Sequence, residues 1–283
     1  MRVSMGRLIA ALSLAFMASA PVAGRSDPAP PAAEEILKRA EEIRSPDLDY
    51  AVDLTLVVRD PNSFWKERSA SYTMVAHGKD HSFILMREPR QFHPGTLLIM
   101  NNLYWMLYPR AEKPLQLSSQ QILSGDVSNG DLARGNLLKH YHVRVVGEET
   151  VEQDPCWVLE LTRADYVANY PRIKYWVTRK KFQPRRFEYY GETERLLKIV
   201  LYDNYRKGPL GTRPMRIEVR AQAQPSETTT MTFTDLRRID VTGLTFDLPG
   251  LTAFRDAARS QIGADGAQAR PEDLVALLRS RGP

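Results

Sequence analysis

Apolar and polar residues alternate along most of this chain. Tyr50, Val52, Leu54, Leu56 and Val58 are separated by mostly more polar residues. Because successive side chains of a β-strand point to opposite faces, this alternation predicts a strand with one buried face. Similar runs, separated by turn residues, follow at 72–76, 83–86, 96–100, 103–108, 141–146, 156–161, 173–177, 187–190, 196–202, 215–219 and 229–233. The pattern predicts about eleven or twelve strands.

Helical spacing of apolar residues precedes and follows the strand region. From Ile36 onward, apolar residues recur on one face of a helix that Pro46 ends. Residues 131–138 predict a second, short helix, and residues 253–262 predict another after the alternation stops. Pro271 begins a last helix with leucines on one face. This last helix either packs on the sheet or docks to a partner.

So many strands in series, with few helices between them, predict an antiparallel meander. Such a sheet is long enough to curl into a barrel or half-barrel. The even spacing carries no repeated sequence signature, so a propeller is less favoured. The predicted fold class is mainly β with a helical lid (α+β).

The first residues have the pattern of a secretory signal peptide. Arg2 and Arg7 precede an apolar run over residues 8–18, and small residues follow up to Gly24. We expect export and cleavage after Ala23 or Gly24. The alternative is that the segment stays in place as an N-terminal anchor.

These boundaries predict four parts. They are a signal peptide at 1–24, a proline-rich linker at 25–33, a main domain at 34–253 and a C-terminal helical extension at 254–283. The expected location is the periplasm of a Gram-negative-type cell. The single cysteine, Cys156, lies in an apolar strand beside Trp157, so we expect a buried small side chain.

Charge and motifs exclude several classes of function. Without Arg2 and Arg7, 37 of the 39 basic residues remain against 34 acidic ones, too mild an excess to indicate nucleic-acid binding. The chain has no Gly-x-Ser-x-Gly elbow, phosphate loop or dinucleotide fingerprint. We therefore expect no enzyme activity, no catalytic residues and no cofactor. The pairs His77/His81 and His140/His142 could hold a metal, but solvated histidines are the favoured interpretation, so no metal site is predicted.

The alternation also selects a candidate inner face. An open antiparallel barrel places one apolar set of side chains inside and a polar set outside. The candidate ligand-facing residues are Leu54, Leu56, Met74, Phe83, Leu85, Trp105, Leu107, Leu159, Leu161, Tyr175, Leu197, Ile199, Ile217 and Phe233. Adaptable methionines that suit varied chains are Met74, Met100, Met106, Met215 and Met231. The alternative is a closed core without a ligand.

An ordered series of short motifs resembles a known family. Its most specific part is the strand Leu103-Tyr104-Trp105-Met106-Leu107-Tyr108-Pro109, followed by a Ser/Gln loop at 118–121 and Gly125-Asp126-Val127-Ser128. Further parts are 95–100, Asp131-Leu132, 174–177, 184–190, 197–205 and 214–219. Across residues 34–248 the chain resembles the outer membrane lipoprotein-sorting family, the superfamily of LolA, LolB and RseB.

The resemblance implies an incomplete antiparallel barrel wrapped around a helix. It also implies an apolar interior that takes acyl chains of a lipid or lipoprotein, and thus a monomeric periplasmic carrier or chaperone. One alternative is an RseB-like sensor or adaptor, which the predicted C-terminal helix favours. Another is an accessory subunit of a lipid-exporting transporter. Either alternative involves a protein partner in the inner or outer membrane.

Two surface clusters are candidates for a lid or a membrane contact. Phe64 and Trp65 stand beside Lys66 and Arg68, and the basic turn Arg179-Lys180-Lys181 precedes a second basic pair at 185–186. Aromatic and basic residues together suit a membrane interface or the mouth of a cavity. The alternative is that both are ordinary solvated turns.

Overall fold

The protein is described by a computed structural model, which covers residues 31–118, 122–124, 127–128, 137–261 and 270–280. The chain divides into two units, residues 1–31 and residues 32–283. The predicted signal peptide and residues 25–30 of the predicted linker lie outside the described residues. Within the described part, no helix is long and apolar enough to cross a membrane.

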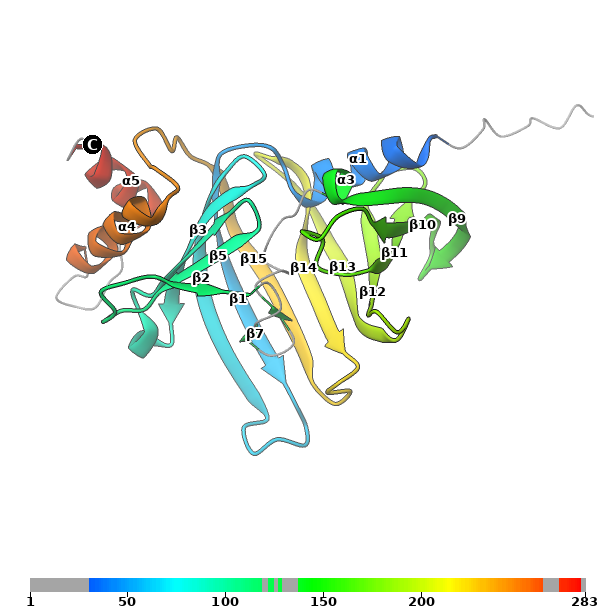
Figure 1. The fold of residues 1–283 in the computed structure, drawn as a ribbon, viewed down its shortest axis with the longest axis horizontal. Helices are drawn as coiled ribbons and strands as arrows, with labels where there is room; N and C mark the ends of the chain where they lie inside the picture. Colours follow the sequence, from blue (N-terminus) through cyan, green and yellow to red (C-terminus); the bar gives the residue numbers. More distant parts are fainter. Residues whose placement is uncertain (1–30, 119–121, 125–126, 129–136, 262–269, 281–283) are drawn as a thin grey trace, which may run out of the picture. The chain divides into compact units, whose positions relative to one another are not determined.

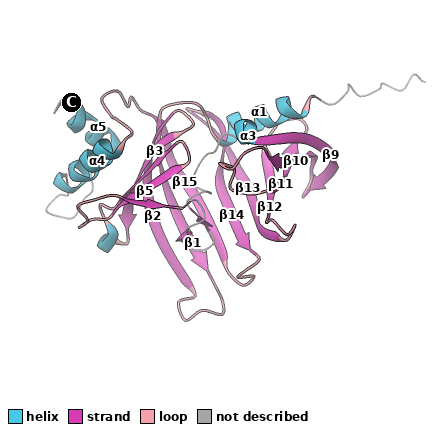
Figure 2. Ribbon diagram, in the orientation of Figure 1, coloured by secondary structure: helices cyan, strands magenta, loops and turns pink. Residues whose placement is uncertain are grey.

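The second unit is built on one antiparallel sheet of thirteen strands (Figures 1 and 2). Its strands are β1 (Tyr50–Arg59), β2 (Glu67–His77), β3 (His81–Glu88), β4 (Thr96–Met100), β5 (Leu103–Leu107), β6 (Leu115–Leu117), β9 (Tyr141–Val151), β10 (Asp154–Arg163), β11 (Arg172–Thr178), β12 (Pro184–Tyr190), β13 (Leu196–Gly208), β14 (Gly211–Ala221) and β15 (Thr228–Arg238). A separate two-stranded sheet joins β7 (Ile122–Ser124) to β8 (Val127–Ser128). A short 3-10 helix, η1 (Arg90–Phe92), connects β3 to β4.

The order of the strands explains why the sheet stays open. It runs β6-β5-β4-β3-β2-β1-β15-β14-β13-β12-β11-β10-β9, so the first and last strands of the chain, β1 and β15, pair in the middle. The outer strands β6 and β9 do not pair with each other. The predicted incomplete antiparallel barrel is confirmed, with thirteen strands in place of eleven or twelve.

The helix α1 (Ala33–Arg44) packs on the concave face of this sheet against β9, β12 and β14, at one end of the strands (Figure 1). Its apolar stripe of Ile36, Leu37 and Ala40 is completely buried against the sheet. Glutamates in its first turn and Arg44 in its last turn favour the helix dipole. The amphipathic spacing predicted from the sequence therefore corresponds to the helical lid.

A second apolar core lies on the other face of β2–β5. There α4 (Leu248–Ser260) packs on the sheet through Leu251 and Phe254, and Phe254 stacks on Phe83 at 4.9 Å between ring centroids. The Asp247 carboxylate caps α4 by accepting from the Gly250 amide at 2.7 Å. A Cβ on Gly250 would meet the Thr245 carbonyl oxygen at 1.7 Å, so only glycine fits this turn.

The C-terminal helix α5 (Pro271–Ser280) belongs to the same core. Its Leu274 and Val275 are buried, and Glu272 accepts hydrogen bonds from Arg237 of β15. The sequence left open whether this helix packs on the sheet or docks to a partner. In the structure it packs on the rest of the molecule. The predicted boundary between residues 253 and 254 falls inside α4.

The thiol of Cys156 is fully buried on the outer face of β10, beside Val158 and Trp176. Burial raises the pKa of this thiol to about 11. We expect a thiol reagent at pH 8 to label the folded protein more than about 100-fold more slowly than the urea-unfolded chain, because the unfolded thiol has a pKa of about 8.5. Equal rates in the two states would contradict the placement of Cys156.

Candidate functional site

Two adjoining cavities lie between α1 and the concave face of the sheet. Their volumes are about 70 Å³ and about 90 Å³. Both are lined by Arg44 of α1, Tyr202 of β13, Ile217 of β14 and Met231 of β15. The shared lining places the two cavities on either side of these four side chains.

The larger cavity has a mainly apolar lining. Further lining residues from the sheet and its turns are Pro46, Tyr50, Val52, Met74, Leu210, Arg213, Pro214, Met215, Phe233 and Leu236. Three methionines, Met74, Met215 and Met231, therefore surround one small space. Unbranched, polarizable thioether side chains can adapt to apolar ligands of different shape.

Arg44 introduces a charge between the cavities. Its guanidinium binds the Glu41 carboxylate through two hydrogen bonds, of 2.8 Å and 2.6 Å, and it lies 5.9 Å from the centroid of the Phe187 ring. Burial acts to lower the pKa of Arg44, but Glu41 outweighs it and leaves the pKa above its ordinary value. The cavity region thus contains a paired, permanently charged group at the C-terminal end of α1.

A hydrogen-bonded loop lies beside the smaller cavity. This loop joins β10 to β11, and its Asp165 binds His140, the last residue of α3 (Leu137–His140), at 2.7 Å between carboxylate oxygen and Nδ1. Asp165 also accepts from the Val167 and Ala168 amides at 2.9 Å and 3.2 Å. The hydrogen bond with His140 lowers the pKa of Asp165. His140 is thus used to hold the loop, and the described residues contain no group of three or more metal-ligating side chains.

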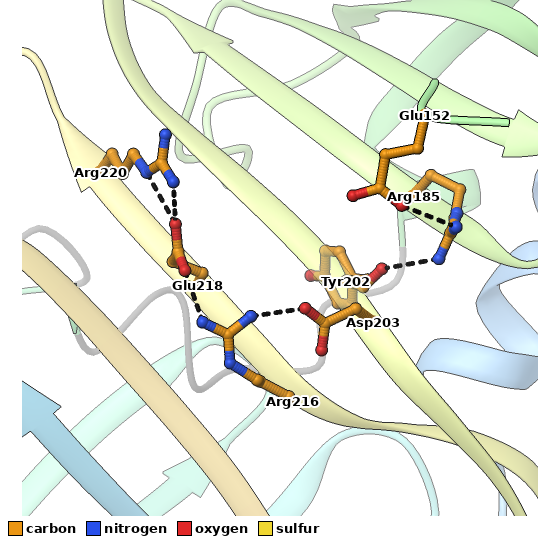
Figure 3. Close-up of polar contacts among 7 residues, drawn as sticks. All are labelled: Glu152, Arg185, Tyr202, Asp203, Arg216, Glu218 and Arg220. Atoms are coloured by element: carbon orange, nitrogen blue, oxygen red, sulfur yellow. Dashed lines mark hydrogen bonds and ion pairs between the residues drawn. The ribbon is translucent and has the colours of Figure 1, made fainter. Parts of the chain in front are cut away.

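The outer face of the same strands is polar. In Figure 3, Glu218 accepts from Arg216 at 2.6 Å and from Arg220 at 2.7 Å, and Arg216 also donates to Asp203 at 2.5 Å. Partial burial acts to raise the pKa of Glu218, but the two arginines outweigh it and lower the pKa. At the β12 end of this view, Arg185 donates to Glu152 at 3.2 Å. The sheet is therefore apolar towards α1 and salt-bridged on its outer side.

Eight of the predicted ligand-facing residues belong to the concave face. Three of them line the larger cavity: Met74, Ile217 and Phe233. Five are buried in the surrounding core: Leu54, Leu56, Leu159, Leu161 and Tyr175. Tyr175 stacks on Phe187 at 3.7 Å between ring centroids.

Six predicted residues belong to the opposite face and are corrected here. Phe83, Leu85, Trp105 and Leu107 pack in the core beneath α4. The strands β3 to β5 are apolar on both faces because both are covered, so alternation could not identify the inner one. Leu197 and Ile199 alternate along β13 with the inward-facing Val200 and Tyr202.

A buried lysine explains the error in β13. Lys198 shares the inner face with Val200, and its ammonium lies 5.2 Å and 5.6 Å from the centroids of the Tyr170 and Tyr189 rings. In the sequence, a lysine between two aliphatic residues of a strand predicts that the lysine faces solvent and that its two neighbours face the core. The cavity residues that the sequence missed include Tyr202, whose position follows once Lys198 is assigned inward. No sequence signal marked Arg44.

The two predicted lid or membrane clusters lie at opposite ends of the strands. Phe64 and Trp65 occupy the β1–β2 turn, at the end where Arg59 pairs with Glu67. Arg179-Lys180-Lys181 form the β11–β12 turn, and the pairing from β1 through β15 to β11 places that turn at the other end. Arg179 is bound to Glu148 at 2.8 Å. The clusters therefore do not form one surface.

Part of the most specific sequence motif cannot be placed. Residues 119–121, 125–126 and 129–136 lie outside the described residues, and with them most of the predicted helix at 131–138.

An open antiparallel sheet with a helix across its concave face defines the LolA-like class of fold. A family model described as "Uncharacterized protein" matches residues 78–246, more than half of the chain, and the chain belongs to that family. No curated protein sequence matches the chain significantly.

Solved structures agree with this class. A LolA superfamily protein from Nitrosomonas europaea is 28% identical, with a TM-score of 0.70, and the match covers 77% of this chain and 98% of that one. A DUF1329 family protein from Desulfovibrio piger is 19% identical, with a TM-score of 0.69 over 77% of this chain and 97% of that one. A domain assigned to outer membrane lipoprotein sorting, from Vibrio parahaemolyticus, is 17% identical, with a TM-score of 0.66 over 77% and 97% of the two chains. The predicted LolA-like relationship is confirmed.

Proposed function

We propose that this protein is a periplasmic carrier that binds an acyl chain of a lipid or lipoprotein between α1 and the concave face of its sheet. The observation that carries the proposal is the apolar cavity lined by three methionines beneath an amphipathic helix. Each methylene that leaves water contributes about 0.8 kcal/mol, so such a space can accept hydrocarbon from a membrane. The binding involves no covalent chemistry and no cofactor.

Binding a whole chain requires the space to widen. An engineered cavity that binds benzene has a volume of about 150 Å³, and each cavity here is smaller. The described state is therefore the closed form in this proposal. The segment between α1 and β1, residues 45–49, is the place where α1 can pivot away from the sheet as a chain enters.

The charge at Arg44 gives the ligand an orientation. Its pairing with Glu41 keeps the guanidinium within the cavity lining. An acyl chain placed among the methionines can bring a carbonyl or carboxylate oxygen towards this guanidinium, since arginine donates to such oxygens. The polar end of the ligand then lies beside α1 and the hydrocarbon lies against the sheet.

The packing of α5 favours a carrier over a sensor or adaptor. The adaptor interpretation used this helix as a free docking element. Its Leu274 is buried in the core that α4 forms with the sheet, Leu277 and Leu278 pack against that core, and Glu272 is bound to Arg237. The apolar face that would recruit a partner is already used within the molecule.

Titration with a fluorescent fatty acid tests the proposal. We expect saturable binding with increased emission, and competition by unlabelled palmitate and by a lipidated peptide. An identical peptide without its acyl chains should not compete. Absence of probe binding by the folded protein, at concentrations where the probe itself stays dispersed, would overturn the proposal.

A further inference from the structure

The β1–β2 hairpin ends in two adjacent exposed aromatic side chains. Phe64 is 87% exposed and Trp65 is 66% exposed, and their rings meet edge to face with centroids 5.0 Å apart. Large apolar side chains in this number and proximity are unusual on a loop that contacts only water.

The register shows that the hairpin projects beyond its neighbour on one side. β2 begins at Glu67, but its pairing with β3 begins only at Ser71, which lies opposite Glu88. The first four residues of β2 therefore extend past β3, as the long β1–β2 hairpin in Figure 1 illustrates. The turn itself is held by hydrogen bonds, because the Asp60 amide donates to the Lys66 carbonyl at 3.0 Å and the Asp60 carboxylate accepts from the Asn62 amide at 3.0 Å. The aromatic pair is thus presented by an ordered tip.

This tip cannot act as a lid over the cavities. The larger cavity touches β1 at Tyr50 and Val52, and the tip begins beyond Arg59. Seven residues of extended strand from Val52 to Arg59 span about 23 Å. Of the two roles predicted for Phe64 and Trp65, the structure favours the membrane contact.

The charges around the tip are mostly neutralised. Arg59 binds Glu67 at 2.8 Å, and Arg68 binds the buried Glu227 at 2.9 Å. Lys66 forms no ion pair among the described residues. Asp60 in the same turn balances the charge of Lys66, so the tip offers aromatic rings with no net charge, which suits insertion at a lipid interface more than electrostatic attraction.

The size of the tip argues against a protein partner. An aromatic side chain buries about 150–250 Å², so two of them supply less than the roughly 800 Å² that each partner contributes to a stable protein interface. Two rings on a narrow hairpin can instead enter the interfacial layer of a bilayer without any complementary surface.

We propose that the Phe64–Trp65 tip inserts into the interface of a lipid bilayer and docks the protein there reversibly. The inference deepens the proposed carrier function by naming the surface to which the carrier docks, and it rests on that function for its purpose. The affinity of the tip for lipid is nevertheless measured separately from acyl-chain binding.

Brominated phosphatidylcholine vesicles provide the test, since bromine quenches tryptophan that enters the bilayer. Trp157 and Trp176 are buried and Trp105 packs beneath α4, so Trp65 is the exposed reporter among the four tryptophans. We expect quenching of the unmodified protein, and at least a fivefold smaller quenched fraction in Trp65→Phe, which still sediments with the vesicles. Absence of quenching in the unmodified protein would overturn the proposal.

A matched pair of double variants separates docking from folding. Phe64→Ser/Trp65→Ser should lose vesicle sedimentation at least tenfold while keeping its melting temperature and its binding of the fluorescent fatty acid. Val146→Ser/Tyr166→Ser, which alters exposed apolar residues elsewhere, should sediment as the unmodified protein does. Undiminished sedimentation of the first variant would overturn the proposal. Replacing a quarter of the neutral lipid by anionic phosphatidylglycerol should strengthen docking only a few fold, and docking that requires the anionic lipid would also overturn it.

Discussion

Replacing Ile217 by tryptophan is expected to reduce acyl-chain affinity by at least about tenfold. Ile217 lines both cavities, and an indole there occupies the space that the ligand needs. If the indole keeps two or more methylenes of the ligand out of the cavity, at about 0.8 kcal/mol each, the loss corresponds to about a tenfold or greater decrease in affinity. Titration with the fluorescent fatty acid measures the effect.

Ile199→Trp is the matched control for this variant. Ile199 is half-buried like Ile217 and lies on the neighbouring strand β13, but on the outer face of the sheet. We expect its affinity for the probe to equal that of the unmodified protein. Loss of binding in Ile199→Trp together with full binding in Ile217→Trp would place the ligand on the outer face of the sheet. That result would contradict binding in the cavities beneath α1.

Replacing Phe254 by alanine is expected to lower the free energy of unfolding by about 3–5 kcal/mol. Phe254 is 1% exposed and stacks on Phe83 in the core between α4 and the sheet. Truncating it leaves a cavity beneath α4. Urea denaturation followed by circular dichroism measures the change.

The same substitution at Phe64 is the control, because Phe64 is almost fully exposed. Phe64→Ala should change the free energy of unfolding by no more than about 0.5 kcal/mol. If Phe254→Ala unfolded at the same urea concentration as the unmodified protein, the C-terminal helices would be a detachable extension. That result would restore the adaptor interpretation of α5.

The class of fold could be predicted from the sequence because its signals are local. Period-two alternation identified the strands, and the helical stripe from Ile36 identified the lid. Pairing of β1 with β15 is not encoded by any short pattern, since it joins residues about 180 positions apart and depends on the whole sheet. The motif series supplied what the periodicity could not, namely that the sheet stays open around a helix.

The candidate site could be predicted only in part. In strands that are buried on one face, such as β1, the alternation of apolar and polar residues identified the inward-facing residues correctly. In β3 and β5 both faces are apolar, so Phe83 and Trp105 were assigned to the wrong core. Lys198 reversed the assignment of β13, because its ammonium is accommodated by tyrosine rings that lie far away in sequence.

Because both cavities are too small for a whole acyl chain, the proposed function requires α1 to move away from the sheet. In the proposed function the protein releases its cargo as well as binding it, and the movement of α1 that would admit a chain would also limit how tightly the chain is held. The work of displacing Ile36 and Leu37 from the sheet offsets part of the gain from burying hydrocarbon.

Methyl resonances of the methionines test the central claim most directly. Met74, Met215 and Met231 line the larger cavity, whereas Met100 packs beneath α4 on the opposite face. In protein labelled with ¹³C at the methionine methyls, addition of palmitate should shift the first three resonances and leave that of Met100 unchanged. Binding that shifts Met100 and leaves the three cavity methionines unchanged would contradict the account.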